Sequence, residues 1–357
     1  MRILTASDIC RAIDALPKNK LYGYVNPNTH GEIKIISVGL PEGPILFKRR
    51  KIKGEGDWSK QESISANMLW RITNALNSKI PVNIDRIFAG SYNTRSVLEA
   101  LLAYTPEIYI CKPGRQEIIG NKVEIKPGHK HILWREDELH TLGNIEKLDL
   151  NDDYVVSERP SYDMAYDVTP PVRTGMGIDI SRRHSQIQVA LAEIAYALGM
   201  KAWISVQDQS IIHNRRKIIE YEFVINDLNK EKAISNFPSA IAVAKNIDCI
   251  YFSDSGIPLF AFEVEHTTGV MSGLDRMLQF KTEADHLNTK YVIVAPDSDR
   301  QNVLKKASRE QFSDLKPLYF PYTYVEELYS FISRYKGRIK GIKREFLETF
   351  MEEIPSK

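Results

Sequence analysis

The chain has 357 residues, of which 43% are hydrophobic and 26% are charged, and its formal net charge at pH 7 is +2. These values are typical of a globular protein with two domains, and they exclude a chain that binds nucleic acid through a global basic charge. No apolar run approaches the roughly eighteen residues of a membrane span, and the N-terminus lacks the apolar stretch of a secretory signal. Three widely spaced cysteines in apolar segments predict reduced core residues and a cytoplasmic protein: Cys10, Cys111 and Cys249.

Residues 1–150 alternate between strand-like and helix-like segments, which predicts an N-terminal α+β domain. The expected strands are 33–40, 43–50 and 106–114, and the expected helices are 64–77 and 94–104. Residues 151–183 are rich in Pro, Gly and Asp and lack periodicity, so we expect a linker there.

The order of helix-like and strand-like segments in residues 184–357 predicts a third region, an α/β/α layered domain with a mixed central sheet. Its first helix, 184–199, carries an apolar stripe formed by Ile187, Leu191, Ile194 and Leu198. The expected order of the remaining elements is strands 202–207, 218–225, 246–252 and 258–266, helix 271–287, strand 290–296, helix 299–312, strand 317–320 and helix 323–337.

The strand 258–266 is apolar except for Glu263 and Glu265, which project to one side. A two-residue turn at Ser255-Gly256 would join this strand to 246–252 as a hairpin and place Asp248 directly opposite Glu263. Three carboxylates would then converge on one patch. The alternative is a solvent-facing strand with ordinary acids, although helices on both faces should cover it.

Close carboxylates repel one another, and a divalent cation relieves this repulsion. Mg²⁺ prefers oxygen ligands, polarises a phosphodiester and lowers the pKa of a bound water. The pattern therefore favours metal-dependent hydrolysis of a phosphodiester.

The order of helix, strand, Asp-bearing strand and acid-x-acid strand over residues 184–322 resembles the PD-(D/E)XK nuclease superfamily, especially type II restriction endonucleases. The resemblance implies that Asp248 and Glu263 bind Mg²⁺, and that Glu265 is catalytic at the position where lysine is usual. It also implies double-stranded DNA as the substrate and an N-terminal domain that helps to recognise it. Because cutting two strands commonly uses two active sites, we expect a homodimer.

Four helical residues are accessory candidates in this interpretation. Glu193 would add an acid, Lys281 would replace the missing strand lysine, and Arg276 and Gln279 would reach a phosphate. An ordinary role on a helix surface is the alternative for each. His266 and a second acid-x-acid segment, Glu220-Tyr221-Glu222, are weaker candidates for the site.

Candidate DNA contacts come from two basic segments, 48–53 and 334–344, and from the start of the helix 94–104. The residues singled out are Lys48, Arg49, Arg50, Lys51, Asn93 and Arg95. A solvated basic face or helix capping explains them as well. His129, His131 and His140 lack nearby cysteines, so we expect no zinc site.

Two alternatives to a restriction endonuclease remain, namely a structure- or damage-directed repair nuclease and an inactive DNA-binding protein of the same fold. A glycosidase is less favoured, because three carboxylates this close fall near or below the spacing for retaining catalysis.

Overall fold

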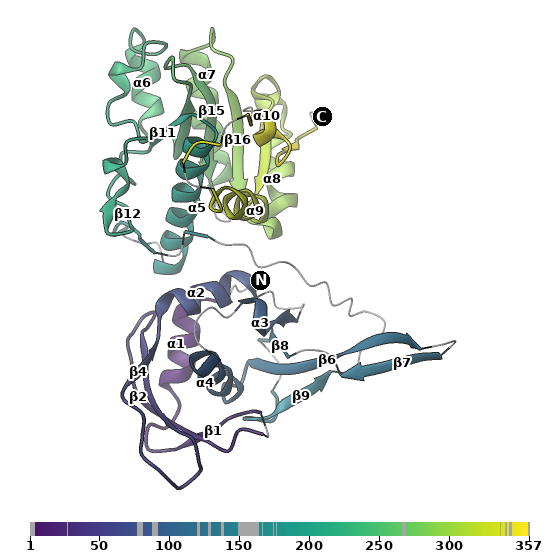
Figure 1. The fold of residues 1–357 in the computed structure, drawn as a ribbon. Coiled ribbons are helices and arrows are strands. Elements are labelled where there is room, and N and C mark those ends of the chain that lie inside the picture. Colours follow the sequence, from purple (N-terminus) through teal and green to yellow (C-terminus); the bar gives the residue numbers. More distant parts are fainter. Residues whose placement is uncertain are drawn as a thin grey trace. The chain divides into compact units, whose positions relative to one another are not determined.

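The computed structural model divides into two compact units, Met1–Ser161 and Tyr162–Lys357, which are described separately (Figure 1). The described residues are 4–26, 28–76, 81–87, 92–119, 122–127, 130–136, 139–148, 164–165, 167–173, 175, 177–265, 269–335, 337–339, 341–342 and 345–355. Residues 151–163 of the predicted linker lie outside this set.

Unit 1 is an α+β unit whose helices pack on its strands around one apolar core. Its first helix begins at a capping box, in which the Thr5 side chain accepts from the Asp8 backbone N–H at 3.1 Å. The helices are α1 (Ala6–Asp14), α2 (Ala66–Ala75), α3 (Ile84–Ile87) and α4 (Tyr92–Ala103).

Two sheets lie in the described part of unit 1. One has the order β1-β2-β3-β4, with β1 (Tyr22–Gly23), β2 (Glu32–Val38), β3 (Ile45–Arg50) and β4 (Glu62–Ile64). The other has the order β5-β8-β6-β7, with β9 paired to β6, and comprises β5 (Val82–Asn83), β6 (Ile108–Ile119), β7 (Lys122–Pro127), β8 (His131–Trp134) and β9 (Ile145–Leu148).

Unit 2 is built on a six-stranded sheet of order β11-β14-β15-β16-β17-β18. The β15–β16 and β16–β17 pairs are parallel and the other pairs are antiparallel, which confirms the predicted mixed sheet. The strands are β11 (Lys201–Ile204), β14 (Cys249–Phe252), β15 (Pro258–Val264), β16 (Lys290–Ala295), β17 (Leu318–Pro321) and β18 (Glu352–Glu353).

Helices cover both faces of this sheet (Figure 1). Residues of α5 (Ile178–Ala197) and α9 (Tyr322–Ile332) share one core with Cys249, Tyr251 and Phe262. Residues of α6 (Pro238–Ala244), α7 (Val270–Glu283) and α8 (Arg300–Ala307) share the other core with Ile250 and Ala261. Alternate side chains of the same strands thus enter opposite cores, as the pleat requires.

Unit 2 also contains a smaller sheet and several short elements. A three-stranded sheet has the order β10-β12-β13. The elements are β10 (Val168–Thr169), β12 (Ile212–His213), β13 (Arg216–Lys217), η1 (Ile218–Glu220), η2 (Leu228–Lys230), η3 (Asp297–Asp299), η4 (Glu310–Leu315) and α10 (Glu345–Glu348).

Three sequence predictions for unit 2 differ from the structure. The predicted strand 218–225 is wrong: the segment begins as the short helix η1, and its backbone pairs with β11 through an isolated parallel bridge between Val224 and Ala202 rather than through a strand ladder. The first helix begins at Ile178, six residues earlier than predicted, because its buried residues include polar ones that interrupt the apolar stripe. Helix α6, which starts with Pro238, was not predicted.

Two other predictions agree with the structure. All three cysteines are free and buried. Within the described residues, none of the helices is long and apolar enough to span a bilayer.

Candidate active site

The hairpin β14–β15 carries the acidic residues, and its register agrees with the predicted one at the end where they lie. Cys249 pairs with Phe262 and Ile250 with Ala261, so continuing the register by one residue places Asp248 opposite Glu263. The predicted two-residue turn is wrong. Ser253 donates its backbone N–H to the carbonyl of Ile257, which leaves a three-residue loop, and a β-bulge between Tyr251 and Phe252 restores the register.

Three carboxylates, those of Asp248, Glu263 and Glu265, gather at this end of the hairpin and form what we term the carboxylate cluster. Glu263 is fully buried, and Asp248 and Glu265 are 9% and 7% exposed. Burial, followed by repulsion from Asp248, raises the pKa of Glu263 well above its ordinary value and that of Glu265 to about 7. The cluster therefore holds more negative charge than its surroundings stabilise.

Arg276 of α7 supplies the nearest positive charge to this cluster. Its Nε lies 3.0 Å from Oε1 of Glu263 and its Nη2 lies 2.5 Å from Oε2, a two-pronged contact. The sequence suggested a phosphate contact for Arg276, whereas the structure directs its guanidinium to the carboxylate of Glu263. Gln279, the other helical candidate, is exposed.

Two glycines allow the N-terminus of α7 to approach the carboxylates closely. A β-carbon at Gly273 would lie 2.8 Å from Oε1 of Glu265 and 3.0 Å from Cβ of Glu263. A β-carbon at Gly269, the residue that caps α7, would overlap with the Glu265 carboxylate. Glu265 therefore lies where the partial positive charge of a helix N-terminus favours an anion.

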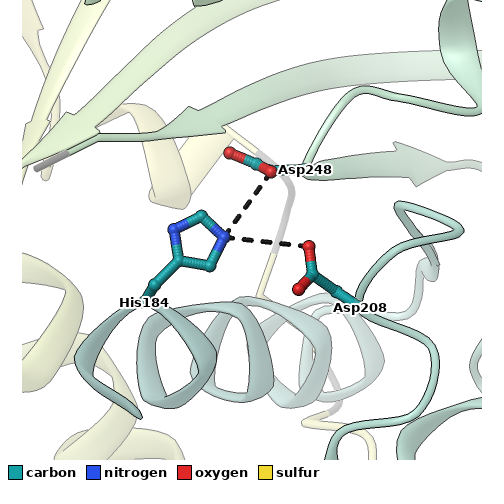
Figure 2. Close-up of side chains that lie close together, drawn as sticks. All are labelled: His184, Asp208 and Asp248. Carbon is teal, nitrogen blue, oxygen red and sulfur yellow. Dashed lines mark ion pairs between the residues drawn. The ribbon is translucent and has the colours of Figure 1, made fainter. Parts of the chain in front are cut away.

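On the other side of Asp248, helix α5 contributes His184 and the loop after β11 contributes Asp208 (Figure 2). Nε2 of His184 lies 3.6 Å from Oδ1 of Asp248 and 3.8 Å from Oδ2 of Asp208. Among the His, Cys, Asp and Glu residues that the structure describes, these three form the group that could hold a metal ion, since their donor atoms all lie within 4.8 Å of one another. We call it the histidine–aspartate cluster; the sequence predicted Asp248 alone among its members.

Hydrogen bonds hold both aspartates in place. Asp248 Oδ2 accepts from the Val264 backbone N–H at 2.8 Å, which leaves Oδ1 facing His184. Asp208 Oδ2 accepts from Ser205 Oγ at 2.6 Å and from Gln188 Nε2 at 3.0 Å, and its Oδ1 pairs with Arg173.

The pKa values on this side move in opposite directions. Burial opposes both charged forms, but His184, Ser205 and Arg173 lower the pKa of Asp208 well below its usual range. The two aspartates raise the pKa of His184 to about 10.

The accessory candidates Glu193 and Lys281 have other partners. Glu193 follows His184 by nine residues on α5, which turns it by about 180° to the opposite face. Its Oε1 lies 3.1 Å from Nε2 of His213. Lys281 donates to the backbone carbonyl of Asp314 rather than to a carboxylate of the cluster.

The basic segment 48–53 is partly neutralised. Arg49 pairs with Glu62 at 2.9 Å, and Arg50 pairs with Glu32. Lys51 is exposed and Lys48 is half-buried on β3; on α4, Asn93 is exposed and Arg95 is half-buried.

The second basic segment, 334–344, is described in part. There Arg338 pairs with Asp254 at 3.2 Å.

The structure also shows the surroundings of several weaker candidate residues. Glu220 and Glu222 are exposed. His131 is buried in β8, and the imidazole Nε2 of His140 lies 2.8 Å from the carbonyl of Thr105. His129 and His266 lie outside the described residues.

Sequence reasoning missed His184, Gln188 and Asp208. The first two did leave a signal, since they are polar residues four positions apart on a helix that is otherwise buried. Asp208 left none, because it lies in a loop whose position depends on the tertiary contacts of Ser205, Gln188 and Arg173.

Comparison with known proteins gives the relationship of the chain. A family model described as the type II restriction enzyme NmeDI C-terminal domain matches residues 168–354. The type II restriction enzyme NmeDI of Neisseria meningitidis serogroup C is 45% identical over 353 residues, which is 98% of this chain and 98% of the relative. No solved structure matches significantly. These findings confirm the resemblance to type II restriction endonucleases: the chain belongs to the NmeDI family of type II restriction enzymes.

Proposed function

We propose that the chain is a Mg²⁺-dependent endonuclease that hydrolyses double-stranded DNA at a specific sequence, with a catalytic centre of the PD-(D/E)XK type in unit 2. The observation that carries the proposal is the carboxylate cluster of Asp248, Glu263 and Glu265, buried at the end of a rigid hairpin. The relationship to a type II restriction enzyme supports the same reaction.

The donor set suits a hard divalent cation. Type II restriction enzymes generally need a divalent metal, and Mg²⁺ prefers oxygen ligands in a well-defined geometry. The raised pKa values of Glu263 and Glu265 mean that their negative charges lack sufficient compensation from Arg276. A dication would supply that compensation, so the charge and the oxygen donors of these residues suit the ion.

Each residue then has a defined task. Asp248 and Glu263 hold the metal, and the backbone N–H of Val264 orients the Asp248 carboxylate. Mg²⁺ at such a site polarises the phosphodiester and lowers the pKa of a bound water. Glu265 replaces the usual lysine, and its carboxylate accepts a proton from the attacking water. In the metal-free protein, burial raises the pKa of this carboxyl to about 7, which makes it a stronger base than an ordinary glutamate.

Unit 1 contributes DNA contacts in this proposal. Lys48 and Lys51 on and after β3, and Asn93 and Arg95 in the first turn of α4, would contact phosphates or base edges. Arg49 and Arg50 are paired with acids and would add less. Replacing Lys48 and Lys51 with Ala should lower the salt dependence of DNA binding, whereas Arg49→Ala should change it less.

The test is cleavage of plasmid and phage DNA with Mg²⁺ by the wild-type protein and by Asp248→Ala and Glu263→Ala variants. We expect discrete fragments from the wild type and a loss of cleavage in both variants. Glu222→Gln, at an exposed glutamate, is the matched control and should cut normally.

The outcomes separate the alternatives. Undiminished cutting by both Ala variants would reject the proposed site. Cleavage of branched or damaged DNA without discrete bands would indicate a repair nuclease. DNA binding without cleavage under any divalent metal would indicate an inactive member of the fold.

We also propose a homodimer, since one active site per strand is the simplest way to cut both strands. Sedimentation equilibrium of the full chain without DNA should give twice the monomer mass of 40.9 kDa. A single chain bound to one cut site would contradict it.

A further inference from the structure

The histidine–aspartate cluster lies beside the proposed Mg²⁺ site but offers a different set of donor atoms. We propose that His184, Asp208 and Asp248 form a separate site for a transition-metal dication such as Zn²⁺ or Co²⁺, which shares Asp248 with the carboxylate cluster. Binding at this site does not rest on the nuclease proposal, because it requires neither DNA nor cleavage.

The spacing of the donor atoms fits a metal placed between them. Zinc ligands lie about 2.1 Å from the ion, so two ligands at a tetrahedral angle lie about 3.4 Å apart. Nε2 of His184 lies 3.6 Å from Asp248 Oδ1 and 3.8 Å from Asp208 Oδ2. An imidazolium hydrogen-bonded to either carboxylate would instead lie within about 2.9 Å of it.

The imidazole is buried and directed into this gap (Figure 2). The His184 side chain is 8% exposed, and within the described residues its Nε2 makes no hydrogen bond, only the two longer ion-pair contacts with the aspartates. A buried nitrogen held by long contacts alone is costly, which makes this atom the second observation, besides the aspartates, that points to a ligand. The side-chain oxygen of Gln188, also fully buried, lacks a partner in the same part of the protein.

The surroundings of the site resemble the outer shell of a metal centre. Gln188 Nε2 bridges the Asp208 carboxylate and the Asp248 backbone carbonyl, at 3.0 and 3.2 Å. Ser205 and Arg173 hold Asp208, and Val264 holds Asp248. Both carboxylates are thus oriented before any ion arrives, as outer-shell partners do in metalloproteins.

The donor set also decides which ions bind. Imidazole nitrogen suits Zn²⁺, Co²⁺ and related transition ions, whereas Mg²⁺ favours oxygen alone. Since Asp248 belongs to both clusters, an ion beside His184 would draw its Oδ1 away from the Mg²⁺ site.

The probe is Co²⁺, whose visible absorption is intense in tetrahedral mixed nitrogen–oxygen sites and weak in octahedral oxygen sites. Titration of the full metal-free chain should produce an intense band that saturates at one ion per chain and that excess Mg²⁺ does not remove. His184→Gln should weaken Co²⁺ binding at least about tenfold and abolish the intense band.

Two variants serve as controls. His286→Ala, at a half-exposed histidine outside the cluster, should leave the band unchanged. Glu263→Gln disables the proposed Mg²⁺ site and should also keep the band. Circular dichroism establishes that each variant is folded, and electron paramagnetic resonance of Cu²⁺ bound to the wild type should show coupling to one imidazole nitrogen.

An unchanged band in folded His184→Gln, or the absence of an intense band in the wild type, would overturn the inference. Loss of the band in Glu263→Gln alone would place Co²⁺ in the carboxylate cluster and would also overturn it. Failure of DNA cleavage with the band retained would reject the nuclease proposal and leave this site intact.

Discussion

The two sides of Asp248 bury carboxylates in different ways. Towards α7, Glu263 and Glu265 share one guanidinium, that of Arg276, and their pKa values are raised. Towards α5, Asp208 is equally buried, but its pKa is lowered. It accepts from Ser205, Gln188 and Arg173.

The comparison shows that burial alone does not set the charge state of an acid. The number of donors around a carboxylate decides whether it stays ionised. The α5 side is stabilised by the protein itself, whereas the α7 side retains uncompensated charge and so provides the stronger driving force for binding a dication.

The largest effect is expected for Asp248→Asn, which acts on both sides at once. We expect DNA cleavage to fall at least about a thousandfold, because the shared ligand loses its charge. Co²⁺ binding should weaken as well, while the side-chain amide oxygen of the variant still accepts from Val264 and the fold is retained. Asp254→Asn, in the exposed hairpin loop, is the control for cleavage rates and should retain normal activity. A variant that loses only one of the two functions would show that the two sites are independent.

Gly273→Ala should disturb the α7 side alone. The new β-carbon would lie 3.0 Å from Cβ of Glu263, which is an inflexible atom, so the carboxylates must shift. We expect a loss of about a hundredfold in cleavage rate, as small displacements of reacting groups cause, with Co²⁺ binding unchanged. Gly177→Ala, where a β-carbon meets open space, is the matched control. Normal cleavage by Gly273→Ala would contradict the close approach of α7.

Arg276→Met should leave Glu263 buried without its partner and cost about 3 kcal/mol of unfolding free energy at neutral pH. The folded-state pKa of Glu263 is already raised and would rise further, so the folded protein binds a proton that the unfolded chain has lost. Stability should therefore fall as pH rises from pH 5 to pH 8 in urea unfolding, in the variant as in the wild type. Arg300→Met, which breaks the exposed pair with Glu352, should cost less than about 1 kcal/mol at both pH values.

Glu265 should make the stability of the metal-free protein depend on pH. Its pKa is raised from 4.5 to about 7, so the unfolding free energy should decrease by up to about 3 kcal/mol as pH rises through this window. Glu265→Gln should flatten the dependence, whereas Glu222→Gln should not. An equally steep pH dependence in Glu265→Gln would assign the effect to another group.

The smallest effect is expected for Glu193→Gln. This residue pairs with His213 and lies outside both clusters, so cleavage should stay within about twofold of the wild type. The pKa of His213 should fall, because burial lowers it and the Glu193 carboxylate opposes that effect. Titration by NMR measures this change. A tenfold loss of cleavage would instead support the role of Glu193 as an accessory acid of the active site.

The layered α/β class of unit 2 and the hairpin that bears Asp248, Glu263 and Glu265 were predictable from the amino-acid sequence. These features follow from local patterns, namely alternating apolar residues and a Gly-containing turn. The predicted turn was one residue too short, but a β-bulge keeps the predicted pairing of the strands near the acids. The restriction-enzyme relationship was visible from the same residues.

The polar groups that contact these acids could not be predicted from the sequence, because they depend on tertiary packing. Arg276 turns towards Glu263, Gly273 lets α7 approach, and Asp208 reaches His184 from a loop. Glu193 and Lys281, plausible from their helices, face other partners. The reason is physical: strand register and helix periodicity are set by neighbours in the chain, whereas the direction of a long charged side chain depends on distant groups that compensate its charge.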